Sequence, residues 1–208
     1  MGLVRLDPTA PETAPPPAGV PPPLAGLLTA LAAPTAADRR AAARALADRP
    51  EAAAALCDRF EVERAPSVRA MILTSLIRIG GPVVAARLVA LLGSDDAVLR
   101  NGAIEALAEL PAAFGPHVEA LLGDPDDDVR LFAVNILSEL PHHEAPDWLL
   151  RVIRHDPHPN ICAAAVDGLA ETGTPAAIPA LESLRDRFPD NAFLAFAVET
   201  AIHRIRGA

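Results

Sequence analysis

The chain of 208 residues contains no lysine and no tyrosine, and aromatic residues make up only 3% of it. All of its basic charge therefore comes from arginine, and alanine and leucine must fill the core. Acidic residues outnumber basic ones, so the formal net charge is −9. Proteins that bind nucleic acids usually present a basic surface to the phosphate backbone. The composition therefore argues against a nucleic acid as the ligand.

Cysteine is scarce as well, since only Cys57 and Cys162 occur, far apart in the sequence. This spacing predicts neither a disulfide framework nor a zinc site, and we expect no metal and no cofactor. The first residues lack the basic-then-apolar pattern of a signal peptide, and no apolar run approaches the roughly 20 residues that span a bilayer. We therefore expect a cytoplasmic protein that does not bind membranes.

One helical pattern occurs six times along the chain. Its anchor positions are Arg39, Arg69, Arg100, Arg130, Cys162 and Leu194, spaced 30 to 32 residues apart. A period of this length is typical of solenoids. A small or apolar residue follows each anchor by three positions, leucine usually follows by seven, and an apolar residue usually precedes it, with Phe193 in the last copy. These offsets share one stripe of an α-helix, so we assign them to the core.

A second apolar helix is predicted between successive copies. Prolines lie near its expected start, at Pro82, Pro116, Pro146 and Pro175. No segment alternates with the period of two that a strand requires. We therefore predict an all-α solenoid of about six helical hairpins. The predicted units are residues 24–50, 51–81, 82–110, 111–140, 141–173 and 174–206.

The fourth unit resembles the HEAT-like repeats of the subtype first noted in phycobilisome lyases. The resemblance rests on Asp124, Asp126, Val129, Arg130, Ala133 and Leu137. It covers residues 24–206 and implies a right-handed superhelix. It also implies a structural ladder in which the turn aspartate and the second-helix arginine pair between neighbouring repeats. Arg69, Arg100 and Arg130, with Asp124, are the expected rungs, and the ladder should stop at Cys162.

Residues 1–23 form a separate proline-rich segment, which we expect to be extended and solvated rather than helical. Two roles are open for it. The segment is either a docking peptide or tether that presents Leu3, Val4 and Leu6 to a partner, or a flexible leader without a specific ligand.

Catalytic and metal-binding interpretations find little support. His143 and His155 are expected at opposite ends of one helix, about 18 Å apart, so one metal cannot bridge them. Deoxyhypusine hydroxylase has a similar architecture but uses several His-Glu pairs, whereas only His143-Glu144 occurs here. Bilin lyases share the repeat subtype, yet Cys162 is the only residue that suggests a tetrapyrrole site. A helical cysteine is more often a core residue than a nucleophile.

The helix face opposite the core stripe is the candidate interaction surface, and it would line the concave side of a curved solenoid. The candidate partner-binding residues are Arg40, Arg44, Arg78, Glu105, Glu109, Glu139, Asp167, Glu171 and Glu199. Arginines gather at the N-terminal end of this face, and acids gather in its middle and C-terminal part. The face is either a groove for a ligand or a solvated surface that keeps the protein soluble. Trp148 is either a packing residue or an interface anchor.

We therefore predict a non-catalytic scaffold or adaptor that binds a protein partner with a basic or amphipathic segment through the concave face. Such a protein would serve a bacterial signalling or regulatory complex. The alternative is an accessory or catalytic subunit of a modifying enzyme such as a bilin lyase. Oligomeric state does not follow from the sequence.

Overall fold

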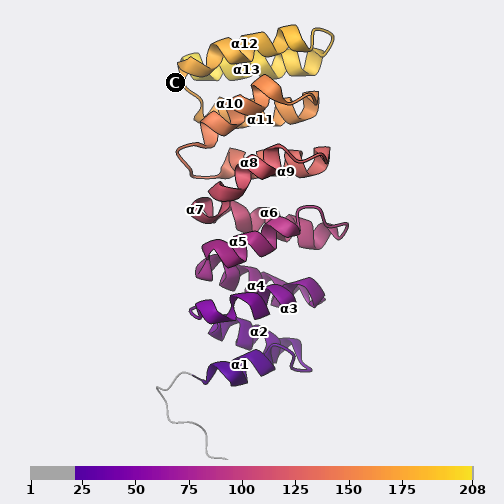
Figure 1. Cartoon of the computed structure of the whole chain (residues 1–208), viewed down its shortest axis with the longest axis vertical. Helices are drawn as coiled ribbons and strands as arrows, with labels where there is room; N and C mark the ends of the chain where they lie inside the picture. Colours follow the sequence, from indigo (N-terminus) through magenta and orange to yellow (C-terminus); the bar gives the residue numbers. More distant parts are fainter. Residues whose placement is uncertain (1–21, 208) are drawn as a thin grey trace, which may run out of the picture.

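The computed structural model describes residues 22–207, in which helical hairpins stack one upon the next into an elongated solenoid (Figure 1). Within this range every regular element is helical. The second helices of the hairpins are α2 (Ala36–Ala45), α4 (Pro66–Ile79), α6 (Ala97–Ala108), α9 (Asp127–Glu139), α11 (Pro159–Thr172) and α13 (Ala192–Gly207). The first helices are α1 (Leu24–Ala30), α3 (Ala53–Val62), α5 (Gly81–Ala90), α7 (Pro111–Phe114) with α8 (Val118–Leu122), α10 (Ala145–His155) and α12 (Ile178–Arg187).

Local sequence signals determine where the second helices begin. Thr35, Asp96 and Asp126 each accept a backbone N–H from the first turn of the helix that follows, which satisfies a donor without an intrahelical partner. Between α4 and α5 the chain turns sharply at Gly80 and Gly81, whose φ angles of 60° and 82° lie in the left-handed region. Glycine adopts that region without steric cost.

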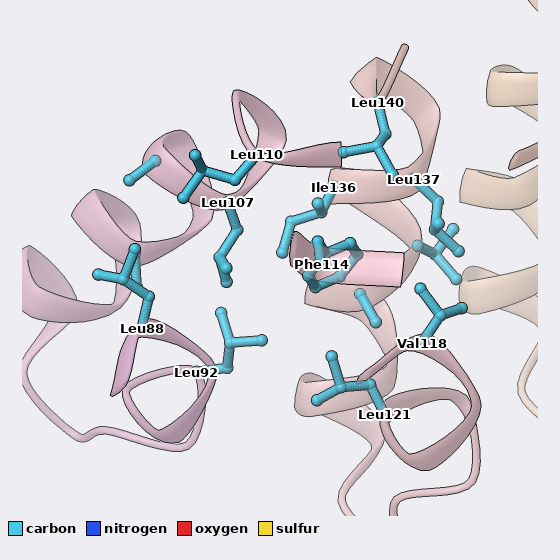
Figure 2. Packing of buried hydrophobic residues seen from close by; sticks show 14 of the residues in the cluster. Leu88, Leu92, Leu107, Leu110, Phe114, Val118, Leu121, Ile136, Leu137 and Leu140 are labelled. Carbon is cyan, nitrogen blue, oxygen red and sulfur yellow. The ribbon is translucent and has the colours of Figure 1, made fainter. Parts of the chain in front are cut away.

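Two of the predicted core columns are confirmed in all six copies. The residues three and seven positions after each anchor are all buried, and Leu107 and Leu137 have exposed fractions of 0% and 1%. Figure 2 shows Leu107 with Ile136 and Phe114 in the space between the third and fourth hairpins, and Leu137 with Val118 on the side of the fourth hairpin that faces the fifth. Because aromatic residues are scarce, branched aliphatic side chains provide most of this apolar contact area.

The fourth hairpin departs from the prediction in its first helix. Pro116 was expected near the start of that helix, but the helix begins at Pro111 and is interrupted by a 3-10 turn at Gly115–His117. Proline lacks the amide hydrogen that an α-helix needs at an interior position, and its ring clashes with the preceding turn. The first helix is therefore split into α7 and α8, which Figure 1 shows as two short pieces.

The last hairpin also departs from the predicted register. Phe193 was assigned to the core, yet its exposed fraction is 67%, whereas Leu194 is buried at 1%. In α13 the buried residues are Leu194, Ala197, Val198, Ala201, Ile202 and Ile205. Leu194, and not Phe193, therefore occupies in α13 the place that Val129 occupies in α9. The face that α13 buries is shifted by one residue from the predicted one.

Almost all of the predicted N-terminal segment 1–23 lies outside the described residues, as do Leu3, Val4 and Leu6. Among residues 22–207, no helix is both long enough and apolar enough to cross a membrane.

Candidate protein-binding face

The second helices together form one long surface, which we call the second-helix face. All nine candidate partner-binding residues on it are exposed: Arg40, Arg44, Arg78, Glu105, Glu109, Glu139, Asp167, Glu171 and Glu199. The rotation of the helices deduced from the 3.6-residue period is therefore right for these positions, except that Glu199 is exposed on another side of its helix, as described below.

Side chains near the C-terminal ends of successive second helices form a row along this face. At the N-terminal end of the row, the Arg78 guanidinium of α4 meets the carboxylate of Asp48, just beyond the end of α2, at 2.6 Å. At the other end, Arg204 of α13 forms an ion pair with Glu171 of α11. Equivalent positions in neighbouring hairpins thus lie close enough for direct contact.

Glu109 and Glu139 occupy the middle of the row. Neither carboxylate has a basic group within 4.0 Å among residues 22–207, whereas Asp48 and Glu171, at equivalent positions of the row, are each paired with an arginine. Both residues also lie at helix C-termini, because Glu109 caps α6 and Glu139 is the last residue of α9. The partial negative charge of a helix C-terminus favours cations and disfavours carboxylates. The chain therefore places two negative charges where its own folding gains nothing from them.

The pairing of Glu171 with Arg204 fixes the register of the last hairpin. These residues are 33 positions apart, whereas Arg151 and Glu119, which pair between the fourth and fifth hairpins, are 32 apart. Thr200 and Arg204 therefore take the places on α13 that were predicted for Glu199 and His203. Glu199 is exposed but is turned away from the row by about 100°, the angle between successive residues of an α-helix.

A groove of about 350 Å³ crosses the C-terminal part of the face. It is lined by Ser138 of α9, by Asp167, Gly168, Ala170 and Glu171 of α11, and by Ala197, Thr200, Ala201 and Arg204 of α13. The small residues keep the floor low, and the acids and Arg204 form its polar rim. Gly168 lets α9 approach α11 closely, since a Cβ atom there would lie 2.4 Å from Ser138 Oγ.

The predicted ladder is present in part. Arg130 Nε donates to Asp156 Oδ2 of the following turn at 2.8 Å, and both residues are buried. Arg130 also donates to the Asp124 carbonyl at 2.9 Å, so Asp124 takes part through its backbone. The Asp124 carboxylate instead accepts the amide of Asp126. Arg130 is thus a rung between the fourth and fifth hairpins.

Arg69 and Arg100 do not make the predicted carboxylate contacts. Each donates only to a carbonyl of its own turn, Arg69 to Glu63 at 2.6 Å and Arg100 to Ser94 at 2.7 Å. For Arg69, the position in the following turn that corresponds to Asp156 is Ser94, which carries no charge. Arg100 stacks over the Phe132 ring at 5.2 Å, and its buried Nε has no hydrogen-bond partner among the described residues.

A rung between the first and second hairpins was missed in the sequence. Arg39 donates from Nε and a terminal nitrogen to both oxygens of Glu63, at 2.8 and 2.9 Å, and only 1% of the Glu63 side chain is exposed. The Arg39 guanidinium lowers the pKa of the Glu63 carboxyl far below its usual range, and bonds from Ala65, Arg59 and Arg64 add to this effect. The signal was available, because Arg39 stands in the anchor column and Glu63 occupies the turn position of Asp124.

The ladder ends at Cys162, as predicted. Its buried Sγ lies 3.4 Å from the Asp156 carbonyl, the position that arginine would reach. Burial raises the pKa of the Cys162 thiol to about 11, and burial does the same for Cys57. Thiols with such pKa values are almost fully protonated at neutral pH and therefore react slowly as nucleophiles.

Trp148 is half-buried and packs against the core, so the structure favours the packing role. Its ring stacks on His142 with centroids 4.8 Å apart, and His142 stacks in turn on His143 at 4.6 Å. No group of three or more potential metal ligands occurs among residues 22–207.

Another cleft, of about 690 Å³, lies between the turns of the fourth and fifth hairpins. Five of its charged residues form ion pairs: Arg130 binds Asp156 and Asp127, and Arg151 binds Glu119. This cleft therefore offers a ligand fewer free charges than the second-helix face does.

Three solved structures are similar to the chain at low sequence identity. An engineered protein has 20% identity and a TM-score of 0.43, over 89% of this chain and 99% of that one. A designed armadillo repeat protein has 17% identity and a TM-score of 0.41, over 88% and 100%. The complex of CpcE and CpcF of phycocyanin lyase from Nostoc sp. PCC7120 has 17% identity and a TM-score of 0.36, over 95% and 100%.

No curated protein matches the chain. The sequence model of one protein family, the HEAT repeats, does match the chain, over residues 24–108 and 116–199. The gap between these segments falls at the interrupted first helix of the fourth hairpin. The matched segments cover most of the chain and contain each of the anchor positions described above. On this ground, together with the stacked hairpins, the chain belongs to the family of HEAT repeats.

Proposed function

We propose that this protein is a non-catalytic scaffold that binds a basic or amphipathic segment of a partner protein along its second-helix face. The observation that carries the proposal is the pair of carboxylates, Glu109 and Glu139, in the middle of a row whose outer members are neutralised by arginine. A partner's arginine or lysine would take the place that Arg78 and Arg204 occupy at the flanking positions.

The cost of these carboxylates supports a role in binding. A charge of the wrong sign at a helix terminus costs about 0.3 to 1 kcal/mol. Residues that oppose local stability without a compensating contact are often found at functional sites. A rigid face made of preformed helices also lowers the entropy lost when an extended partner binds.

The buried state of both cysteines supports a non-catalytic role, because the alternative of a bilin lyase would draw on Cys162 as its reactive group. Addition of a tetrapyrrole should therefore leave the absorption spectrum of the pigment unchanged. We further propose a cytoplasmic location and a place in a bacterial signalling or regulatory complex, since the acidic surface and helical scaffold suit such an adaptor.

The test compares two charge reversals of equal size. The immobilised full-length protein captures partners from a lysate of the source organism, and Glu109→Arg with Glu139→Arg should remove them. The control is Asp147→Arg with Asp186→Arg, which changes exposed acids of the first helices α10 and α12 and should retain them. The affinity of a purified partner, measured by calorimetry, should fall as salt increases because exposed charges are screened.

Equal capture by both double variants would contradict the proposal. Loss of folding would not explain a loss of binding by the Glu109→Arg, Glu139→Arg protein, because arginine suits both helix C-termini better than glutamate does. Its thermal midpoint should equal or exceed that of the wild type.

A further inference from the structure

Two phenylalanines on α13 stand out among the described residues because they are large, apolar and mostly exposed. The exposed fractions of Phe193 and Phe196 are 67% and 69%. Single exposed apolar residues are common on protein surfaces, but two aromatic rings one helical turn apart on one helix form a patch. Exposed aromatic residues of this kind often become the centre of a protein interface.

The patch lies on the side of α13 that borders the groove. With about 100° per residue, Phe193, Phe196, Thr200 and Arg204 fall within an arc of about 80°. Thr200 and Arg204 line the groove, and Arg204 reaches Glu171 of α11. The two aromatic rings therefore continue the groove wall toward the start of α13, and the row of carboxylates runs on from the groove across α9 and α6.

The outer end of the stack has a different character. Glu199 falls within about 20° of Arg206 on the helical wheel, and Arg206 reaches Glu182 of α12 at 3.5 Å. This side of α13 faces away from α11 and carries charged groups. On the wheel Phe193 lies about 20° from Arg204, and Phe196 lies about 40° from Thr200 and about 60° from Glu199. The patch therefore borders the groove on one side and this charged side of α13 on the other.

We propose that Phe193 and Phe196 anchor the apolar end of the same partner segment, whose basic residues extend along the carboxylate row toward Glu139 and Glu109. This inference rests on the proposed function and gives the segment a direction. Charge complementarity identifies the occupant: bulky apolar side chains must lie at one end, followed by arginine or lysine. Three hairpin spacings of about 10 Å separate α13 from α6, so about ten residues of extended chain reach across the site.

The experiment selects ligands from a displayed library of random peptides about sixteen residues long, with the full-length protein as bait. Enriched peptides should combine aromatic or large aliphatic residues with at least two arginines or lysines. Their affinity, measured by fluorescence anisotropy, should fall at least tenfold for Phe193→Ser with Phe196→Ser. The matched control, Val62→Ser with Val83→Ser, removes exposed apolar residues of the first helices α3 and α5 and should leave affinity unchanged.

The possible outcomes separate the two proposals. Peptides that lose affinity for the Glu109→Arg, Glu139→Arg protein but bind the phenylalanine variant normally would overturn this inference and leave the proposed function standing. Absence of enrichment, or enriched peptides without basic residues, would contradict both. Light scattering adds a further arm: a wild-type dimer that becomes monomeric in the phenylalanine variant would assign the patch to a second copy and overturn the inference. Circular dichroism checks that each variant remains helical.

Discussion

At the scale of single residues, the turn acids and anchor arginines explain how neighbouring hairpins are held in register. Glu63 accepts two bonds from Arg39 of the preceding hairpin and also two backbone amides of its own turn, from Arg64 and Ala65. One buried carboxylate thus joins two repeats and shapes the turn between them. A neutral side chain of similar size cannot provide all of these charge-assisted contacts.

Replacing Glu63 with glutamine should therefore lower the free energy of unfolding at neutral pH by about 1.5 to 3 kcal/mol. Because the pKa of Glu63 is lowered in the folded state, its contribution is present above the unfolded pKa of about 4.3 and is lost as the pH falls below it. Urea titrations from pH 7 to pH 3 should show the wild-type and variant stabilities converging at the acidic end. A constant difference across that range would show that the carboxylate charge is unimportant.

Arg130 and Arg100 provide a second comparison, since one has a buried carboxylate partner and the other has none. Arg130→Leu leaves Asp156 buried without its guanidinium and should cost about 3 to 5 kcal/mol. Arg100→Leu removes a buried, unpaired Nε and loses one carbonyl bond and the contact with Phe132, so it should cost about 1 kcal/mol or less. Chemical denaturation of the two variants measures both values, and equal losses would contradict the assignment of Arg130 as the rung.

At the scale of helices, the sequence predicted the repeat and its core columns well because every interior hairpin buries the same stripe. It predicted the last register poorly. The register of α13 is set by its contacts with α11 and α12, and the sequence spacing alone favoured a shift of 32 over the observed 33. The split between α7 and α8 was also missed, since Pro116 suits either a helix start or an interruption.

The second-helix face shows the same division. Its exposed columns followed from helical periodicity, but the ion pairs that neutralise its ends did not. Whether Arg78 meets Asp48, or Arg204 meets Glu171, depends on the offset between neighbouring helices, which sequence spacing fixes only to within a residue. The isolation of Glu109 and Glu139 therefore became visible only in three dimensions.

Contact between α9 and α11 leads to a prediction at this scale. Leu137→Ala, which empties a buried site of α9, should lower the free energy of unfolding by about 2 to 5 kcal/mol. Glu139→Ala, two residues later on the exposed face, should change it by less than about 0.5 kcal/mol. Equal effects in thermal and urea unfolding would show that the assigned rotation of α9 is wrong.

At the scale of the whole molecule, the extensive helix contacts join only hairpins that are neighbours in the stack, as Figure 1 also shows. In such an architecture stability is close to a sum of repeat and nearest-neighbour contributions. The ends of the solenoid, which have a neighbour on one side only, should open more readily than its middle. The second-helix face can then keep its central carboxylates in place even when an end frays.

Leu107→Ala tests this nearest-neighbour behaviour, because Leu107 lies in the third hairpin and packs toward the fourth (Figure 2). Amide hydrogen exchange should become faster in α4, α6 and α9, which surround the altered site. Exchange in α13, three hairpins away, should remain within a factor of about two of the wild type, because no direct contact transmits the change. Mass spectrometry of proteolytic fragments resolves the individual hairpins. A uniform acceleration along residues 22–207 would instead identify the solenoid as one cooperative unit, and a partner bound at the second-helix face would then stabilise both ends equally.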